Sequence, residues 1–318
     1  METLKVAAVQ MAPVWLDREA TTEKVIGRIH ESADQNAKLV AFSEALIPGY
    51  PFWVELTDGA RFNSTVQKEI HAHYMANAVQ IEAGHLDGVC AAAKEREIAV
   101  VLGIIERPQD RGGHSLYASL VYIDVTGQIQ SVHRKLQPTY EERLTWSPGD
   151  GHGLRTHRLG SFTVGGLNCW ENWMPLPRAA LYALGEDLHI AIWPGSERNT
   201  QDITRHIAKE MRGYVMSVSG LMRPNDFPAR TPHRDLILSG LGSGVEFLAN
   251  GGTCIAAPDG SWVVEPVIGR EAVITATLDH RRVREERQNF DPVGHYSRPD
   301  VTQLVVNRQR QSTLKLND

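Results

Sequence analysis

The sequence predicts an α/β fold, because segments typical of buried strands alternate with segments typical of amphipathic helices along the chain. Leu4–Met11 is almost continuously apolar, as expected of a strand covered on both faces. Glu19–Asn36 has apolar residues at the spacing of a helix, which Thr21 or Thr22 is placed to cap. The chain has 318 residues, of which 42% are hydrophobic and 22% charged, and this is enough to bury a large core. Alternation alone favours a doubly wound parallel sheet.

The remaining elements follow in order. The first half is expected to add two helices, Asn63–Ala83 and Asp87–Arg96, and three strands, Ile98–Ile105, Ser115–Asp124 and Gln128–Lys135. The last two strands meet at Val125-Thr-Gly-Gln128, whose glycine is typical of a hairpin turn. The second half is expected to form two helices, Arg178–Leu184 and Asp202–Arg212, and six strands, Phe162–Leu167, Leu188–Trp193, Tyr214–Leu221, Thr253–Ala257, Trp262–Glu265 and Ala272–Asp279. The proline-containing segment Arg223–Gly244 is expected to be a loop, and the mixed-charge run from Arg281 onward is expected to be solvated or salt-bridged.

The charge balance and the apolar runs exclude several classes of protein. With 33 Lys+Arg against 38 Asp+Glu the net charge is −5, so the chain lacks the basic surface that nucleic-acid binding requires. No apolar run reaches the ~18 residues that a membrane-spanning helix needs. Met1–Lys5 leads directly into a strand without a secretory signal, and three widely spaced cysteines do not indicate a disulfide framework. These features predict a cytoplasmic protein with neither nucleic acid nor membrane as a partner.

Cys169 is the first candidate for chemistry, because it lies on the turn between the expected strand Phe162–Leu167 and the expected helix Arg178–Leu184. A cysteine on such a strand-to-helix turn has an exposed sulfur and free backbone N–H groups beside it. This is the geometry of an elbow nucleophile with an oxyanion site. The alternative interpretation is a buried structural thiol, which is what we expect of Cys90 and Cys254 in their small apolar surroundings.

Two other expected strands end in a charged residue. Glu44 follows the apolar run Leu39–Ser43, and Lys135 ends the strand that begins at Gln128. Each of these charges alone is typical of a solvated strand end. However, a glutamate, a lysine and a cysteine that each end a strand lie where α/β folds place their active sites. Together they indicate a catalytic site rather than three unrelated residues.

These residues and their neighbours resemble the nitrilase superfamily of carbon–nitrogen hydrolases. The matching motifs are Ser43-Glu44 with Pro48-Gly-Tyr-Pro51, His133-Arg-Lys135 with Pro138-Thr-Tyr-Glu-Glu-Arg143, Cys169-Trp-Glu171, and Gly294-His-Tyr-Ser-Arg-Pro-Asp300. The tryptophan after the cysteine and the last motif resemble the nitrilase branch itself. The chain departs from the family's usual pattern at Ser43, where proline is usual, and at Ser147-Pro148, which is expected to reshape a loop beside the pocket.

The resemblance implies two β-sheets packed face to face and covered by helices, an α-β-β-α sandwich, in place of a doubly wound sheet. It assigns residues 1–280 to the carbon–nitrogen hydrolase domain and residues 281–318 to a C-terminal tail that contacts other subunits. The family also associates through the helix after the cysteine, here Arg178–Leu184, and can extend into spiral filaments. A homodimer, or a higher oligomer built from it, is therefore expected.

The resemblance also implies that the protein hydrolyses an organic nitrile to a carboxylic acid and ammonia through thioimidate and thioester intermediates. Cys169 is expected to be the nucleophile and Glu44 its general base. Lys135 and the backbone N–H of Trp170 are expected to stabilise the charged intermediate. Glu142 matches the second glutamate of the family and is expected to keep the lysine charged and positioned. No metal or other cofactor is expected.

Four aromatic residues near these motifs are expected to line the substrate pocket, namely Tyr50, Trp53, Trp146 and Trp173. As pocket residues they favour aromatic or arylaliphatic nitriles, and the alternative interpretation is that they pack in the core. Two other functions stay open. An amidase or N-carbamoyl hydrolase would use the same four catalytic residues, although Trp170-Glu171 is more typical of nitrilases. A catalytically silent scaffold would not need these residues at all.

Overall fold

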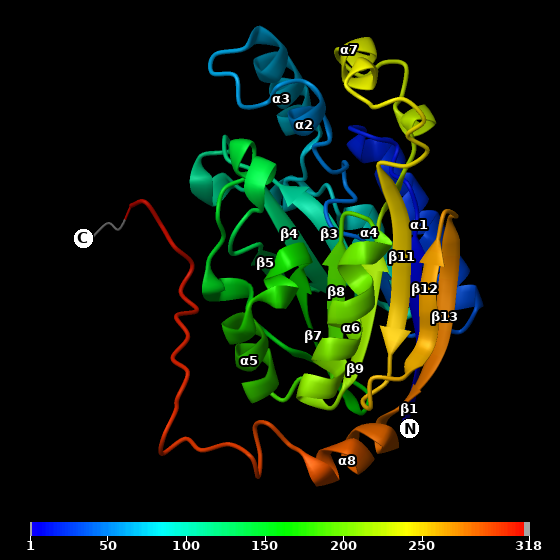
Figure 1. Ribbon diagram of the computed structural model, residues 1–318, viewed down its shortest axis with the longest axis vertical. Helices are drawn as coiled ribbons and strands as arrows, with labels where there is room; N and C mark the ends of the chain where they lie inside the picture. Colours follow the sequence, from blue (N-terminus) through cyan, green and yellow to red (C-terminus); the bar gives the residue numbers. More distant parts are fainter. Residues whose placement is uncertain (1, 315–318) are drawn as a thin grey trace.

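Two β-sheets pack face to face in the computed structural model, which describes residues 2–314, and helices cover the outer face of each sheet (Figure 1). The architecture is the predicted α-β-β-α sandwich and differs from the single parallel sheet that alternation alone favours. Within residues 2–314, every helix is too short or too polar to serve as a membrane span.

Over the described residues, the first sheet has six strands in the order β13-β1-β2-β3-β4-β5. Their bounds are β1 (Thr3–Gln10), β2 (Leu39–Phe42), β3 (Ala99–Glu106), β4 (Tyr117–Ile123), β5 (Ile129–Arg134) and β13 (Ala272–Asp279). β1, β2 and β3 are parallel, whereas β13 pairs antiparallel with β1 from the other end of the sequence. β3, β4 and β5 pair antiparallel, and the turn from β4 to β5 is the predicted hairpin.

Over the same residues, the second sheet has seven strands in the order β10-β11-β9-β8-β7-β6, with β12 paired to β11. Their bounds are β6 (His157–Leu159), β7 (Phe162–Asn168), β8 (Leu188–Trp193), β9 (Tyr214–Ser219), β10 (Leu221–Met222), β11 (Ala249–Ala256) and β12 (Trp262–Ile268). β7, β8 and β9 are parallel, so their carboxyl ends lie at one edge of the sheet. Cys169 follows β7 at this edge.

The packing of β1 explains why its sequence is apolar throughout. Val6 and Ala8 belong to the core between the two sheets, and Ala7 and Val9 belong to the core between the first sheet and its helices. All four side chains are fully buried. Alternate residues of a strand point to opposite faces, so a strand in the middle of a four-layer sandwich needs apolar residues at every position.

Eight α-helices lie within the described residues, namely α1 (Arg18–Asp34), α2 (Trp53–Leu56), α3 (Thr65–Asn77), α4 (Asp87–Arg96), α5 (Pro175–Ala183), α6 (Glu197–Met211), α7 (Arg234–Ser239) and α8 (His280–Asn289). α1 and α4 pack together against the first sheet, while α6 packs on β9 and β11 of the second. In Figure 1, α5 lies beside α6 on the outside of the second sheet. The helix α6 begins at Glu197, ahead of the predicted start at Asp202.

The predicted cap of α1 is wrong. The side chain of Asp17 accepts a hydrogen bond from the backbone N–H of Ala20 at 3.0 Å, so Asp17 is the capping residue. The hydroxyl of Thr21 instead bonds the backbone of Val14, which fixes the approach of the chain to the helix. Aspartate caps a helix at least as well as threonine does. Because Asp17 precedes Thr21 in the chain, α1 begins at Arg18.

Two further segments contain helices that the sequence did not predict. Residues 223–244 include the short 3₁₀ turn η6 (Pro224–Asp226) and α7, which packs on α2. The charged run after Asp279 forms α8, because the Asp279 side chain caps it and Val283 is buried in the core between the sheets. Each helix is stabilised by a partner far away in the sequence, which the local charge pattern does not reveal.

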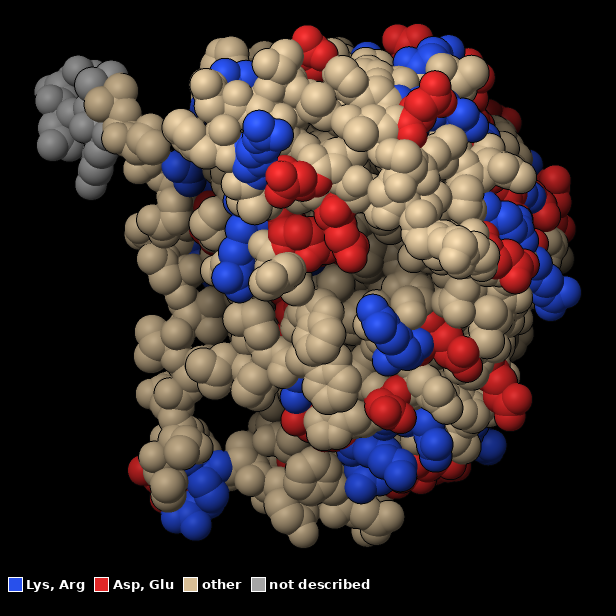
Figure 2. Space-filling view, turned by 45° about the horizontal axis from the view of Figure 1, so that its top comes forward, with Lys and Arg blue, Asp and Glu red and all other residues tan. Residues whose placement is uncertain are grey.

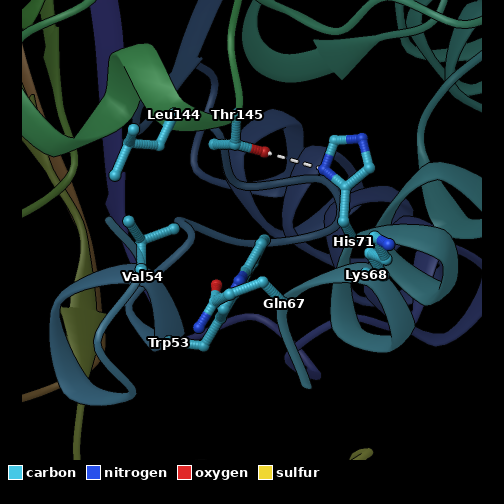
Figure 3. Close-up of a pocket in the computed structure, with 8 residues that line it drawn as sticks. Trp53, Val54, Gln67, Lys68, His71, Leu144 and Thr145 are labelled. Carbon is cyan, nitrogen blue, oxygen red and sulfur yellow. Dashed lines mark hydrogen bonds between the residues drawn. The ribbon is translucent and has the colours of Figure 1, made fainter. Parts of the chain in front are cut away.

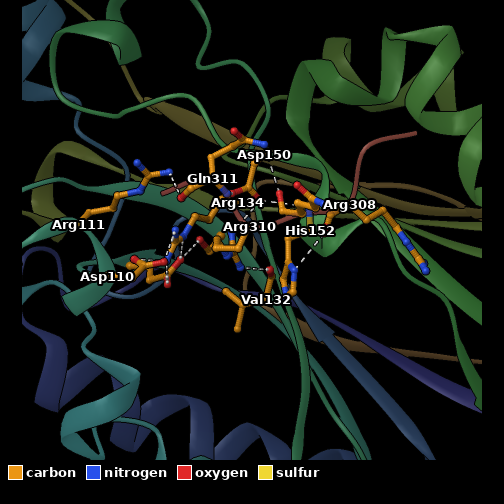
Figure 4. Close-up of polar contacts among 12 residues, drawn as sticks. Asp110, Arg111, Val132, Arg134, Asp150, His152, Arg308, Arg310 and Gln311 are labelled. Carbon is orange, nitrogen blue, oxygen red and sulfur yellow. Dashed lines mark hydrogen bonds and ion pairs between the residues drawn. The ribbon is translucent and has the colours of Figure 1, made fainter. Parts of the chain in front are cut away.

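After α8 the chain runs as an extended tail along one side of the molecule (Figure 1). Asp150 fixes this tail near its end, because its carboxylate accepts hydrogen bonds from Arg310 and from the backbone N–H of Gln311, each at 2.9 Å. Arg111 donates to the backbone oxygen of Gln311 (Figure 4). The tail thus returns to β5, whose residue Val132 accepts a further bond from Arg310.

Candidate active site

The catalytic candidates come from both sheets and meet at one edge of the sandwich. Glu44 follows β2, Lys135 follows β5, and Cys169 follows β7. A backbone hydrogen bond of 3.3 Å from Glu44 to the carbonyl of Trp193, the last residue of β8, joins the two sheets here. All of these side chains are buried. Charged residues in such a position are retained only where they are paired with one another or used in chemistry.

Cys169 opens a tight 3₁₀ turn, η5 (Cys169–Trp173), directly after β7. Its φ of 50° lies in the left-handed region, which costs a non-glycine residue roughly 1–2 kcal/mol. The backbone N–H of Trp170 acts to lower the pKa of the Cys169 thiol. A strained turn directly after a strand is the arrangement of an elbow nucleophile. The predicted exposed sulfur is wrong, since Cys169 is only 3% exposed and packs in a cluster that contains Trp193.

Lys135 lies between two carboxylates. Its ammonium nitrogen is 2.9 Å from Glu44 and 2.7 Å from Glu142, and none of the three side chains is more than 1% exposed. Burial alone would lower the pKa of Lys135, but the nearby Cys169, Glu44 and Glu142 raise it well above its ordinary value. The lysine is therefore a fixed cation at neutral pH.

Burial also shapes the proton affinities of Glu44 and Cys169. Loss of solvation raises the pKa of Glu44 to about 8, against the opposing effect of Lys135. Burial and the adjacent Glu44 raise the pKa of the Cys169 thiol well above its ordinary value. The thiol therefore keeps its proton in the resting protein, so a base has to remove that proton as the sulfur reacts.

Glu44, Glu142 and Cys169 are close enough to act on one bound atom. The sulfur and one oxygen of each carboxylate all lie within 4.8 Å of one another. Three such ligands could face a metal ion, but the Lys135 ammonium group contacts both carboxylates and supplies the positive charge between them. The donor set therefore fits a covalent nucleophile with an acid–base pair and a fixed cation.

Tyr50 and Trp146 adjoin this group. The Tyr50 hydroxyl lies 3.1 Å from an oxygen of Glu142 and 2.9 Å from an oxygen of Glu141, so the two carboxylates share its single proton. The ring of Trp146 packs edge-on against Tyr50, and its centre lies 5.5 Å from the Lys135 nitrogen. The sequence offered no sign of the contact to Glu141, because it forms between segments that are far apart in the chain.

Trp53 and Trp173 have different surroundings. Trp53 is buried against Trp15 and Tyr74, and it borders a cavity of about 210 Å³ beside His71 (Figure 3). This cavity shares Val54, Gly59 and Leu144 with a larger cavity beside it. Trp173 is 44% exposed on the surface of the η5 turn, where its ring stacks with His206. Of the four predicted pocket residues, Tyr50 and Trp146 contact the catalytic groups, Trp53 borders a cavity, and Trp173 lies on the surface. A residue that the prediction missed is Trp193, whose only signal is its place at the end of an apolar run.

A larger cavity of about 560 Å³ opens over the same edge of the sandwich. Its walls come from α2 and the loop after it, from the 3₁₀ turn η3 (Tyr140–Leu144), and from the start of α6. The lining residues are Val54, Glu55, Asp58, Gly59, Ala60, Tyr140, Glu141, Leu144 and Arg198. Figure 2 turns this edge toward the viewer and shows acidic residues beside a hollow. Glu141 connects the cavity to Glu142 through the shared hydroxyl of Tyr50.

The chain is similar in sequence and in fold to known proteins of one family. The family model of the carbon–nitrogen hydrolases matches residues 5–288. An aliphatic nitrilase from Sinorhizobium fredii is 36% identical over 99% of both chains. A protein named nitrilase 2, from an unknown prokaryotic organism, is 35% identical over 99% of this chain and 96% of its own.

The fold has close structural counterparts as well. A carbon–nitrogen hydrolase from Helicobacter pylori superposes with a TM-score of 0.70 at 17% sequence identity, over 94% of this chain and 96% of the other. This likeness concerns the fold alone. The family match and the sequence relatives also identify the family. The chain belongs to the nitrilase branch of the carbon–nitrogen hydrolase family.

Proposed function

We propose that the protein is a nitrilase that converts an organic nitrile and two molecules of water into a carboxylic acid and ammonia, with Cys169 as the nucleophile. The observation that carries this proposal is the position of the Lys135 cation between Glu44 and Glu142, beside the Cys169 sulfur. Relatives that are themselves nitrilases, at about 35% identity and near full coverage, support it.

In the first step Glu44 takes the proton of the Cys169 thiol as the sulfur attacks the nitrile carbon. A carbon–sulfur bond forms, one π bond of the nitrile breaks, and Glu44 passes the proton to the nitrogen, which yields a thioimidate. The raised pKa of the thiol makes this concerted transfer necessary, since a free thiolate is scarce in the resting protein.

Water then adds to the thioimidate carbon, and Glu44 moves a proton from the water to the nitrogen. The resulting tetrahedral carbon carries a hydroxyl, an amine and the sulfur. As the carbon–nitrogen bond breaks, the hydroxyl proton reaches the nitrogen, ammonia leaves and a thioester remains. A second water breaks the carbon–sulfur bond, releases the acid and restores the thiol.

Lys135 and the N–H of Trp170 stabilise the negative charge that develops during these additions. The lysine is already oriented by its two carboxylate partners, so it does not have to reorganise when the charge appears. Glu142 holds the lysine from the other side and is itself fixed by Tyr50 and by the backbone N–H of Thr139 at 2.6 Å.

The nitrile is proposed to enter through the cavity formed by α2, η3 and α6. Its volume of about 560 Å³ lies within the usual range of small-molecule sites and accommodates an aromatic or arylaliphatic nitrile. Val54, Tyr140 and Leu144 provide apolar contacts there. Trp146 and Tyr50, which adjoin the catalytic groups, are proposed to form the floor of the substrate site.

The protein is further proposed to form a cytoplasmic homodimer through α5, from which larger assemblies can be built with the tail. Large apolar side chains in this helix and on both sides of it in the sequence are exposed, among them Trp170, Trp173, Met174, Leu176 and Leu184. Apolar patches of this kind mark contact surfaces. Light scattering of Leu176→Glu should then report a smaller particle than the wild type does.

The decisive experiment measures ammonia release from a series of nitriles and from the matching amides. A nitrilase releases ammonia faster from the nitriles and forms the acid. Faster release from the amides would reassign the protein as an amidase. Absence of turnover together with no reaction between iodoacetamide and Cys169 would leave a scaffold as the remaining interpretation.

A further inference from the structure

Glu171 connects the two catalytic strands although it is not one of the four catalytic residues. One of its oxygens accepts the backbone N–H of Leu136 at 2.7 Å, and the other accepts the backbone N–H of Asn168 at 2.9 Å. Leu136 directly follows Lys135, and Asn168 directly precedes Cys169. A single carboxylate thus bridges the first sheet and the second sheet at the point where the cation and the nucleophile must face each other.

His133 holds this carboxylate in place. Its Nε2 lies 3.2 Å from each oxygen of Glu171, and both side chains are buried. Burial would raise the pKa of Glu171, but His133 and the two backbone N–H groups outweigh burial and lower it. Glu171 is therefore a carboxylate at neutral pH, able to accept both backbone bonds at once.

Asn172 supports the same turn from its other side. Its side-chain nitrogen donates to the carbonyls of Cys169 at 2.8 Å and Leu167 at 3.3 Å. Its side-chain oxygen lies 2.7 Å from Nε2 of His189, and Nδ1 of His189 lies 2.9 Å from Glu186. The side chains of Asn172, His189 and Glu186 are all completely buried. Because the side-chain oxygen of Asn172 is paired with His189, its side-chain nitrogen is turned toward the carbonyl of Cys169.

We propose that Glu171 and Asn172 are positioning residues, which hold Cys169 in its left-handed conformation and at a fixed distance from Lys135. Neither touches the reacting atoms. A backbone at a φ of 50° relaxes unless the surroundings hold it, and the two buried residues bond to it immediately before and after the nucleophile. This inference rests on the catalytic roles of Cys169 and Lys135 proposed above.

The test compares Glu171→Gln with a matched control, Asp187→Asn. Asp187 is also a buried carboxylate that pairs with a histidine, His280, and accepts a backbone N–H, that of Thr163. However, Thr163 lies at the opposite end of β7 from Cys169. Both variants lose a comparable interaction, but only one of them loses it at the catalytic turn.

In Glu171→Gln the amide can accept one backbone bond but turns its NH₂ group toward the other N–H. We expect kcat to fall by about a hundredfold while KM changes by less than about threefold, because displacement of a reacting group costs this much. The rate at which iodoacetamide alkylates Cys169 should fall as well. Asp187→Asn should lower Tm to a similar extent and keep the wild-type kcat per folded molecule.

An unchanged kcat in Glu171→Gln, or an equal loss in both variants, would overturn the inference. If Glu171→Gln does not fold, His133→Asn decides, since it leaves both backbone bonds in place and removes only the support of Glu171. Its kcat should fall by about tenfold with an unchanged KM, and a wild-type kcat would refute the positioning role. Activity in Cys169→Ala would instead refute the proposed nucleophile, so the two failures are distinguishable.

Discussion

The ammonium nitrogen of Lys135 lies 2.9 Å from an oxygen of Glu44, and neither side chain is exposed to solvent. Apart from this ion pair, no group within residues 2–314 donates a hydrogen bond to Glu44. A buried carboxylate with unused acceptor positions is unfavourable for stability. In this site the same positions remain available for the proton of the thiol and for the proton of an attacking water.

Replacement of Cys169 by alanine should abolish turnover and leave the fold unchanged. The variant removes one sulfur from a turn that Glu171 and Asn172 hold through other atoms. We expect nitrile hydrolysis below about a thousandth of the wild-type rate, with an unchanged circular dichroism spectrum. Cys90→Ala serves as the control and should retain full activity, because Cys90 packs at the edge of the first sheet's outer core. Activity of Cys169→Ala within tenfold of wild type would contradict the assignment.

Lys135→Arg should be nearly as damaging, although it keeps the positive charge. The two carboxylates contact a single nitrogen at 2.9 and 2.7 Å in a site closed to solvent, and a planar guanidinium group does not fit there. We expect kcat to fall by about a hundredfold, as measured by steady-state ammonia release. Near wild-type rates would show that Lys135 has a structural rather than a catalytic role.

The activity should rise with pH up to about 8, because Glu44 must lose its proton to act as a base. The raised pKa also affects stability. The folded protein binds the Glu44 proton more tightly than the unfolded protein does. The contribution of Glu44 to the free energy of unfolding should therefore fall as the pH rises from 4.5 to about 8. Thermal unfolding across this range should show the decline in wild type. In Glu44→Gln the decline should be smaller, and an identical slope in both proteins would argue against the raised pKa.

The acid should dominate the products from simple nitriles. The tetrahedral intermediate can expel either ammonia or the sulfur, and the second route yields an amide. Lys135 donates a hydrogen bond to Glu142, and the two are proposed to bind the oxygen and to keep the nitrogen protonated, which would favour loss of ammonia. The share of amide should rise when an electron-withdrawing α-substituent makes the nitrogen harder to protonate. Chromatography of both products across a substituent series measures this share. Amide as the main product from unactivated nitriles would contradict the proposed preference for loss of ammonia.

Asp150→Asn should release the end of the tail. The carboxylate loses its ion pair with Arg310, and its bond from Gln311 weakens. Limited proteolysis should then cut residues 303–311 faster than in wild type. Asp124→Asn is the control, since Asp124 also accepts backbone bonds in a turn, but within residues 2–314 its side chain bonds only to Thr126, Gln128 and Gln130. Equal cleavage of wild type and Asp150→Asn would show that other contacts hold the tail.

Strands were the most predictable part of the fold. The bounds of β8 and β13 agree with the prediction, because each is a short apolar segment between clear breaks in the pattern. The arrangement into two sheets was not predictable from alternation, since β13 pairs with β1 across almost the entire chain. The two-sheet arrangement was predicted only from the resemblance to a known family.

The site was predictable to the extent that its residues end strands. Glu44, Lys135 and Cys169 each occupy such a position, and the structure brings them together with Glu142. The supporting histidines were not predictable. His133 and His189 lie within strands, and their carboxylate or amide partners are fixed only by the tertiary packing. Surface exposure of Trp173 likewise depends on packing rather than on local sequence.

The division of the site between two sheets has a consequence for assembly from the unfolded chain. Glu44, Lys135 and Glu142 are carried by the first sheet, and Cys169 is carried by the second. A partly folded species with only one sheet in place would therefore contain an incomplete set of groups and no catalytic power. Recovery of activity during refolding should coincide with the docking of the sheets and lag behind the recovery of secondary structure.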